Sequence, residues 1–140
     1  MPETAPEPWE YTLHIPHDVR AVTVCRRTLR LILTIHGLIR LTDLAELLAT
    51  ELVANAVQHT KGPAALRLGW RNDVLRIGAW DADPTPPKPP LSPSALTELE
   101  AEEGRGLGLV RACADLWGWN PLSRNGHAGK YVWCEVAAAA

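Results

Sequence analysis

The chain has no phenylalanine, one methionine and only three cysteines among its 140 residues. The cysteines, at positions 25, 113 and 134, are odd in number and far apart, and none belongs to a C-x-x-C pair. This spacing argues against a disulfide framework and against a cysteine metal site. It predicts isolated thiols that pack as small hydrophobic side chains in a reducing compartment. Six tryptophans and two tyrosines supply the aromatic bulk instead.

The sequence also lacks a long apolar run and an excess of basic residues. Nothing approaches the roughly 18 uninterrupted apolar residues of a membrane span, and the proline-rich start has no apolar stretch typical of a signal peptide. The formal net charge is −2 and the pI is about 6.2, which argues against a nucleic-acid surface. With 46% hydrophobic and 21% charged residues, the composition is that of a globular protein. We expect a cytoplasmic protein that contacts neither membrane nor nucleic acid directly.

The segment from Leu44 to His59 is a helix candidate with an unusual polar line. Glu51, Asn55 and His59 follow one another at intervals of four, so a helix places them on one side. They border an apolar line formed by Leu44, Leu48, Leu52 and Ala56. A polar group buried there without a partner would cost about 1–3 kcal/mol. The pattern therefore predicts that these side chains have partners.

The remaining patterns predict the order β-α-α-β-β-lid-α-β-β. Asp18 and Thr42 are the predicted N-caps of the first two helices. The expected helices are 19–35, 44–59 and 107–116, and the expected strands are 9–15, 64–70, 74–80, 118–124 and 130–136. This order indicates an α/β (α+β) two-layer sandwich, in which helices cover one face of a mixed, mostly antiparallel sheet.

Residues 9–136 are expected to form a single domain, with a flexible N-terminal tail at 1–8 and a short C-terminal tail at 137–140. The composition changes between 84 and 103, where five prolines in seven positions are followed by an acidic stretch. Twenty residues of this kind inside a compact domain are typical of a functional loop, so we predict a lid at 84–103.

The first expected helix has a basic face. It carries Arg20, Arg26, Arg27 and Arg30 opposite its apolar side chains. Such a face is usually a solvated surface. The alternative is a docking surface for an acidic partner.

A glycine-rich stretch begins the third expected helix. Gly104, Gly106 and Gly108 free the backbone so that its N–H groups can approach an anion, and Arg105 adds positive charge. A glycine turn without a ligand is the alternative. No G-K-[ST] follows the glycines, so the P-loop motif is absent. The stretch also does not follow the first strand of a β-α-β unit, so it is not the dinucleotide-binding fingerprint.

Three polar residues elsewhere suit a phosphoryl-transfer site. Asp81 ends a buried strand, where it could accept a hydrogen bond from an exocyclic amine or merely cap the turn. Asn55 offers a neutral oxygen to a hydrated Mg²⁺, unless its amide bonds the backbone. Glu51 could accept the proton of a nucleophile, unless it is a plain exposed glutamate.

Taken together, the motifs resemble the GHKL (Bergerat-fold) ATPase and kinase superfamily. The motifs are ELVANAVQH at 51–59, WDADP at 80–84 and GRGLGL at 104–109, and GKYVW at 129–133 is similar to the final strand of those proteins. The resemblance covers about residues 9–136. It is strongest to the anti-sigma-factor serine/threonine kinases, in particular short actinobacterial ATP-binding regulators.

The resemblance implies a role for each matching residue. Glu51 matches the general base, Asn55 the Mg²⁺ ligand and Asp81 the aspartate that bonds the adenine amine. Gly104, Gly106 and Gly108 match the glycines around the phosphates, and residues 84–103 match the ATP lid. Asp83, Arg105 and Leu107 are the other residues expected to bind the nucleotide. His59 matches a histidine often found after the asparagine.

The implied function is that of a kinase that binds ATP and Mg²⁺ and phosphorylates a small anti-sigma antagonist. It would regulate transcription by partner switching, holding a sigma factor when the antagonist is phosphorylated, and the resemblance suggests a homodimer. One departure favours an alternative. Asp83, followed by Pro84, replaces the usual glycine near the base, which would suit a catalytically weak, nucleotide-dependent binding module.

Overall fold

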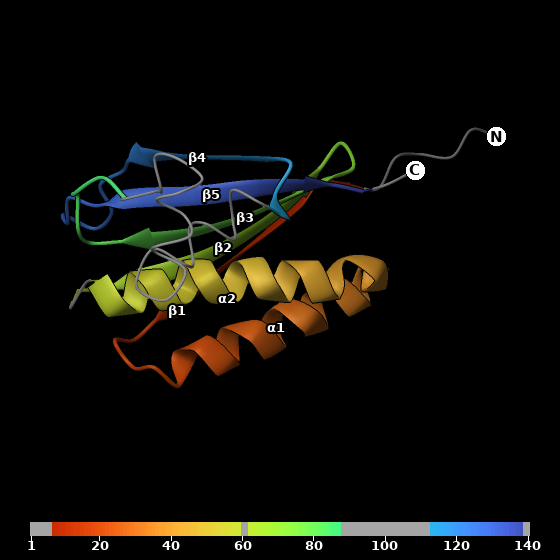
Figure 1. Ribbon diagram of the computed structural model, residues 1–140, viewed down its shortest axis with the longest axis horizontal. Helices are drawn as coiled ribbons and strands as arrows, with labels where there is room; N and C mark the ends of the chain where they lie inside the picture. Colours follow the sequence, from red (N-terminus) through yellow and green to blue (C-terminus); the bar gives the residue numbers. More distant parts are fainter. Residues whose placement is uncertain (1–6, 60–61, 88–112, 139–140) are drawn as a thin grey trace, which may run out of the picture.

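A five-stranded sheet with two long helices on one face makes up the computed structural model, which describes residues 7–59, 62–87 and 113–138 (Figure 1). The elements are β1 (Trp9–Ile15), α1 (Ala21–Ile35), η1 (Ile39–Leu41), α2 (Thr42–His59), β2 (Ala64–Arg71), β3 (Val74–Asp81), β4 (Leu116–Pro121) and β5 (Lys130–Ala137). The strand order is β1-β2-β3-β5-β4, and each neighbouring pair is antiparallel. The expected two-layer α+β sandwich is confirmed, with an antiparallel sheet throughout the described ranges.

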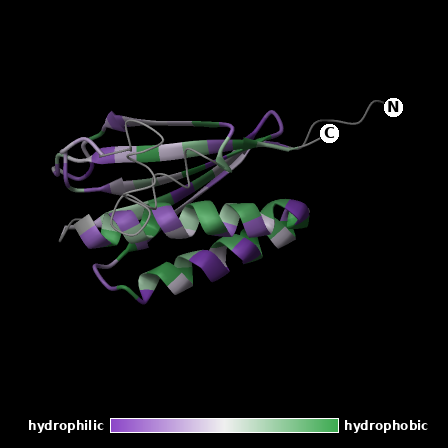
Figure 2. Cartoon of the chain, in the orientation of Figure 1, coloured by the Kyte–Doolittle hydropathy of each residue, from purple (hydrophilic) through white to green (hydrophobic). Residues whose placement is uncertain are grey.

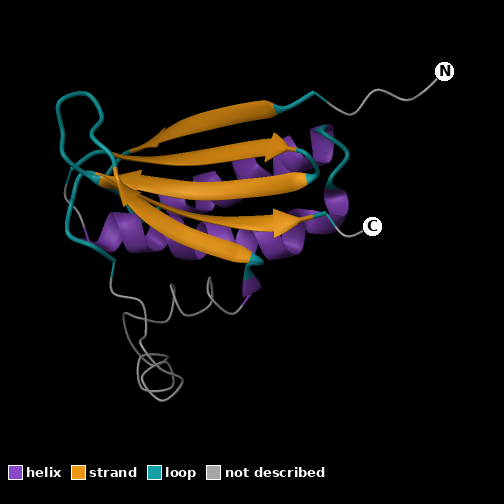
Figure 3. Cartoon of the chain, turned by 90° about the horizontal axis from the view of Figure 1, so that it is seen from above, coloured by secondary structure: helices purple, strands orange, loops and turns teal. Residues whose placement is uncertain are grey.

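The core lies between the sheet and the helices. Helix α2 packs against β2 and β3, and α1 packs against α2 (Figure 3). The apolar line of α2 is buried as predicted: Leu48 and Leu52 are at most 2% exposed, and Leu75 and Ile77 of β3 are fully buried. The helices accordingly show hydrophobic and hydrophilic stretches in alternation (Figure 2), because only one side of each meets the core.

A tight turn joins β2 to β3. Asn72 and Asp73 have φ values of 52° and 62°, and they join β2 to β3 with Arg71 and Val74 directly paired. Positive φ at both central residues is typical of a type I′ turn, whose twist matches that of the strands. The short polar turn predicted here is confirmed.

The hairpin between β4 and β5 is longer than predicted. Strand β4 ends at Pro121, three residues earlier than expected, and β5 begins at Lys130 as predicted. Between them, Asn125 and Gly126 have φ values of 50° and 81° and turn the chain between the bridged residues Arg124 and His127. Glycine suits the second position because an L side chain rarely adopts that conformation.

Both predicted N-caps are corrected. Helix α1 begins at Ala21, two residues later than predicted, with Arg20 in the N-cap position and no side-chain cap. Asp18 lies before that position, and its carboxylate accepts a hydrogen bond from the Arg20 backbone N–H at 2.8 Å. Thr42 is itself helical, and its hydroxyl donates to the Ile39 carbonyl at 2.7 Å. The short helix η1 runs directly into α2, so Thr42 continues a helical chain and does not cap it.

The third helix was predicted to extend too far. Leu116 is the first residue of β4, so the helix expected at 107–116 ends before it. Residues 107–112 lie outside the described residues, as does most of the predicted lid, of which only 84–87 are described. At the C-terminus β5 includes Ala137, and the next backbone N–H, of Ala138, donates to the Asp73 carbonyl at 2.8 Å.

The basic face of α1 does more than contact solvent. The Arg30 guanidinium forms ion pairs with Glu46 and with Asp43, and Arg26 lies 4.0 Å from Glu46. Part of the arginine cluster therefore joins α1 to the first turns of α2.

The cysteines behave as predicted. All three are free, and Cys25 and Cys134 are buried in the core. Burial raises the thiol pKa of Cys25 to about 11 and that of Cys134 to about 12. Across the described ranges, no helix is both long and apolar enough to cross a membrane.

Candidate functional site

The candidate site is positioned by α2 and by the end of β3. The two elements pack against each other, and their C-terminal ends lie at the same end of the molecule (Figure 1). Asp81, the last residue of β3, lies on the helix-covered face, since it continues the alternation of the buried Ile77 and Ala79. The residues predicted from two distant segments therefore come from elements in direct contact.

Glu51 and Asn55 lie one turn apart on α2, and both are half-buried. Their neighbours Leu52 and Ala56 are buried in the core. This placement matches the predicted polar line at the rim of the apolar face. His59 is the last residue of the helix, and its side chain lies outside the description.

Asp81 is a buried carboxylate, only 2% exposed. Its Oδ1 atom accepts hydrogen bonds from the Lys130 ammonium at 3.0 Å and from the Asp83 backbone N–H at 2.9 Å. Burial raises the pKa of the Asp81 carboxyl above its usual value, and the Asp83 N–H and the Lys130 ammonium oppose that rise. The carboxylate is thus desolvated but compensated on one oxygen.

Lys130 is a site residue that sequence reasoning missed. It is the first residue of β5 and the register partner of Asp81, and its side chain is 4% exposed. The sequence did contain a signal for its burial, because Lys130 belongs to the same alternating set as Val132, Cys134 and Val136, which are buried in the core. A lysine on that face needs a nearby acceptor, and a buried lysine is almost always paired.

Asp83 does not need the conformational freedom of the glycine that it replaces. Positive φ values in the described non-glycine residues occur only at positions 72, 73 and 125. The Asp83 backbone N–H bonds Asp81, its carbonyl accepts from Lys130 at 3.0 Å, and its Oδ1 accepts from the Thr85 N–H at 2.9 Å. The turn after β3 is therefore built on polar contacts of the aspartates.

Gly129, just before β5, allows the chain to pass close to the site. A Cβ atom there would overlap the Asp81 carbonyl oxygen and come within 2.9 Å of the Trp80 ring. The same ring donates its Nε1–H to the Leu122 carbonyl at 2.7 Å, which ties the β4–β5 connection to β3. Only glycine fits this close approach.

The predicted phosphate-binding residues Gly104, Arg105, Gly106, Leu107 and Gly108 lie outside the described residues. Within the described ranges, no group of three or more His, Cys, Asp or Glu side chains could hold a metal ion. A site with Asn55 as its protein ligand still fits Mg²⁺, which keeps several waters and takes its other ligands from phosphate oxygens.

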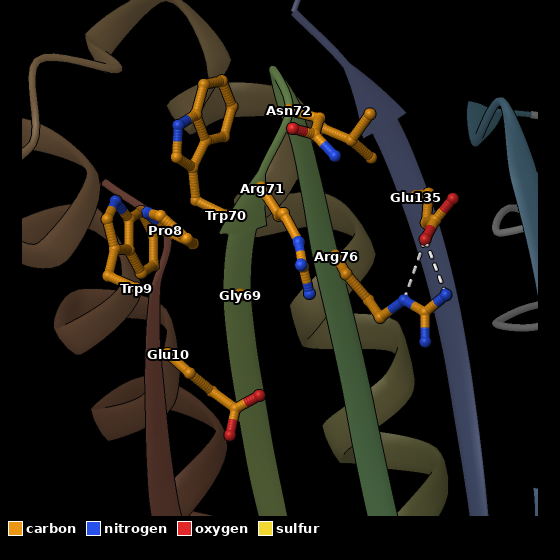
Figure 4. A pocket seen from close by; sticks show the side chains of 10 residues that line it. Pro8, Trp9, Glu10, Gly69, Trp70, Arg71, Asn72, Arg76 and Glu135 are labelled. Atoms are coloured by element: carbon orange, nitrogen blue, oxygen red, sulfur yellow. Dashed lines mark hydrogen bonds and ion pairs between the residues drawn. The ribbon is translucent and has the colours of Figure 1, made fainter. Parts of the chain in front are cut away.

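A hollow of about 720 Å³ lies away from these residues (Figure 4). It runs along the face of the sheet that the helices leave open, between β1, β2, β3 and β5. Arg76 and Glu135, which form an ion pair at 2.7 Å, belong to its lining. No residue of the predicted nucleotide site is among the residues that line it.

The sequence matches a known protein family. A family model described as a histidine kinase-like ATPase domain matches residues 15–133, which is most of the chain. The match begins at the end of β1 and extends into β5. No curated protein matches the sequence.

Proposed function

Because the chain belongs to the histidine kinase-like ATPase domain family, we propose that it binds ATP with Mg²⁺ and acts as an anti-sigma-factor-type serine/threonine protein kinase. Its substrate is a serine or threonine of a small antagonist protein. The unphosphorylated antagonist engages the kinase, whereas its phosphorylation leaves the kinase bound to a sigma factor. We further propose that the active species is a homodimer.

The observation that supports this proposal is the joint placement of three polar residues. Glu51 and Asn55 lie half-buried on the helix that packs against β3, and β3 ends in the buried Asp81. An ATP site of a kinase requires a carboxylate that binds the adenine on one side. On the other side it requires a metal ligand and a proton acceptor.

In the reaction, the hydroxyl oxygen of the antagonist attacks the γ-phosphorus, the bond to the β–γ bridging oxygen breaks, and ADP leaves. Glu51 accepts the hydroxyl proton. Asn55 would hold the Mg²⁺, which would supply positive charge to neutralise the phosphates. Backbone N–H groups around Gly104 to Gly108 and the Arg105 guanidinium bind the phosphate oxygens, and Asp81 accepts a hydrogen bond from the adenine amine.

A titration with Mg²⁺-ATP followed by phosphotransfer tests the proposal. We expect calorimetry to give saturable binding, and radiolabelled γ-phosphate to move from ATP to a small anti-sigma antagonist protein. Glu51→Gln should lower the transfer rate by at least about 100-fold with little change in ATP affinity, since only the proton acceptor is lost. Gln58→Ala, an exposed residue of the same helix, is the matched control.

The outcomes separate the steps of the proposal. Absence of binding at millimolar ATP would refute the nucleotide site. An unchanged rate for Glu51→Gln would refute its assignment as the base. A dimer should give twice the chain mass in light scattering.

A second candidate is a nucleotide-dependent binding module that sequesters its partner without catalysis. It is favoured by the outer surface of α1, where Val24, Leu31 and Ile35 are 56%, 58% and 71% exposed. Aliphatic side chains so close together on a helix suit a protein partner. This function predicts that Glu51→Gln still captures the antagonist or the sigma factor, whereas Leu31→Asp does not.

A further inference from the structure

We propose that Lys130 is a positioning residue that makes the nucleotide site selective for a purine with an exocyclic 6-amine over one with a 6-carbonyl group. The inference rests on the proposed nucleotide function and extends it, because it explains how Asp81 is kept as an acceptor. Lys130 acts through Asp81 and through the turn after β3, without touching the reacting phosphate.

Within the described ranges, the Asp81 carboxylate accepts hydrogen bonds on its Oδ1 atom only. The Lys130 ammonium and the Asp83 backbone N–H both donate to that atom. Two donors saturate the two lone pairs of that oxygen. The second oxygen, Oδ2, is therefore the acceptor left for a ligand, and its direction is set by the way Lys130 and Asp83 hold the carboxylate.

An ionised carboxylate only accepts hydrogen bonds, whereas a protonated one also donates. An amine at position 6 of the base donates to a carboxylate, but a carbonyl oxygen there would face it acceptor to acceptor. Lys130 opposes the effect of burial on Asp81 and so favours the ionised, amine-selective form.

Lys130 also holds the turn that carries Asp83. The Lys130 ammonium donates to the Asp83 carbonyl at 3.0 Å as well as to Asp81, so one buried cation joins the strand end to the loop that follows. This contact holds the segment where a glycine is usual, and it does so without a left-handed backbone. Lys130 thus orients the Asp81 carboxylate and holds the backbone of the turn that follows it.

Few titratable residues lie on the described elements around Asp81. Asp83 follows it in the loop, and Glu51 and His59 are the titratable residues on the second half of α2, the helix that packs against β3. On the β2 side, the register partner of Asp81 is the uncharged Ala64. Lys130 is therefore the basic group paired with Asp81 in the described part of the chain.

The test compares ATP with inosine triphosphate, which carries a 6-carbonyl group, by calorimetry on the full chain with Mg²⁺ at pH 6, 7 and 8. We expect the wild-type preference for ATP to be constant over this range. Lys130→Met should reduce the preference about tenfold or more, most strongly at pH 6, because the buried acid then takes up a proton as the pH falls. Lys130→Arg should restore it.

Two further variants separate charge from structure. Lys130→Gln keeps hydrogen-bond donors without the charge, and it should show the same pH-dependent loss even if Lys130→Met does not fold. Arg76→Met breaks the exposed ion pair on the opposite face of the sheet and should leave the nucleotide preference unchanged.

The results can overturn the inference alone or together with the function. If the wild type binds ATP but Lys130→Gln keeps its full preference at pH 6, Lys130 does not set selectivity. If the substitution weakens the binding of ATP and of inosine triphosphate equally at every pH, the inference is also refuted, since an equal loss is a purely structural effect. If the wild type binds neither nucleotide, the proposed function itself fails.

Discussion

Two ion pairs cross the same two strands, β3 and β5, on opposite faces of the sheet. Asp81 pairs with Lys130 at 3.0 Å on the helix-covered face, with side chains 3% and 4% exposed. Arg76 pairs with Glu135 at 2.7 Å on the open face, with side chains 45% and 23% exposed. Both join direct register partners. The chemistry and the register are similar, so the difference between them comes from solvent.

The buried pair bears a desolvation cost that the exposed pair avoids. Removing one partner of a buried pair leaves an uncompensated charge, whereas exposed pairs contribute little because water replaces the lost partner. Arg76 also lies over the Trp133 ring at 4.3 Å, so its position has a second support. The comparison shows that a buried pair at a strand end needs a reason other than stability, and the candidate site supplies one.

The largest expected effect comes from breaking each pair at one end. Lys130→Met should lower the free energy of unfolding by about 3 kcal/mol, because Asp81 remains buried without its cation. Arg76→Met should lower it by less than about 1 kcal/mol. Urea unfolding measures both, and equal losses would contradict the contrast.

A double-substitution cycle serves as the control. Removing both charges with Asp81→Asn and Lys130→Met should recover most of the stability lost in Lys130→Met, since no unpaired charge remains. If the double variant is less stable than the single one, the loss came from packing and not from charge.

Adding a methyl group beside each pair should have the next largest effect. Gly129→Ala places a Cβ against the Asp81 carbonyl oxygen, whereas Gly78→Ala meets the outer atoms of the Tyr131 ring on the open face. The backbone cannot yield as a ring can, so we expect a loss of about 1–3 kcal/mol for Gly129→Ala and a smaller loss for Gly78→Ala. Thermal unfolding of the two variants compares them, and a larger loss for Gly78→Ala would be inconsistent with this reasoning.

Salt should distinguish the pairs by a smaller amount. At about 1 M salt the Debye length falls to roughly 3 Å, which screens exposed charges but hardly reaches buried ones. The stability difference between wild type and Arg76→Met should therefore shrink by a few tenths of a kcal/mol, while the difference for Lys130→Met stays the same. Urea unfolding at low and high salt gives both values.

The smallest effect concerns acid, where Asp81 and the exposed Asp18 respond in opposite directions. Side-chain hydrogen bonds from Arg20 lower the pKa of Asp18 to about 2, so its contribution is present above the unfolded pKa and is lost as the pH falls through about 2. The pKa of Asp81 is raised, so its contribution is present below the unfolded pKa and is lost as the pH rises through the folded value. Carboxyl titration by NMR should show both shifts, and Arg20→Gln should abolish only that of Asp18.

Local patterns were enough to predict most of the fold. The helical period around Leu48 and Leu52 and the alternation in β2 and β3 reflect which face of each element meets the core, and this is visible in sequence. The errors fell at the ends of elements and at η1, which the sequence patterns did not predict. Threonine is a common N-cap residue, yet Thr42 directly follows η1 and continues the helical chain. Leu116 fits the apolar pattern of the predicted helix, but it pairs with β5 as part of β4. At such ends, contacts with distant segments outweigh local preference.

The sequence by itself determined the helix that carries Glu51 and Asn55 and the strand that ends in Asp81, because the spacing of apolar residues along each segment shows its period and its buried face. Only the tertiary structure decided what lies against Asp81. Lys130 is 49 residues away, and it reaches the carboxylate because the β3–β5 register places the two residues opposite each other on the buried face. Register is set by the pairing of whole strands and by burial of one face, so no short stretch of sequence specifies this contact.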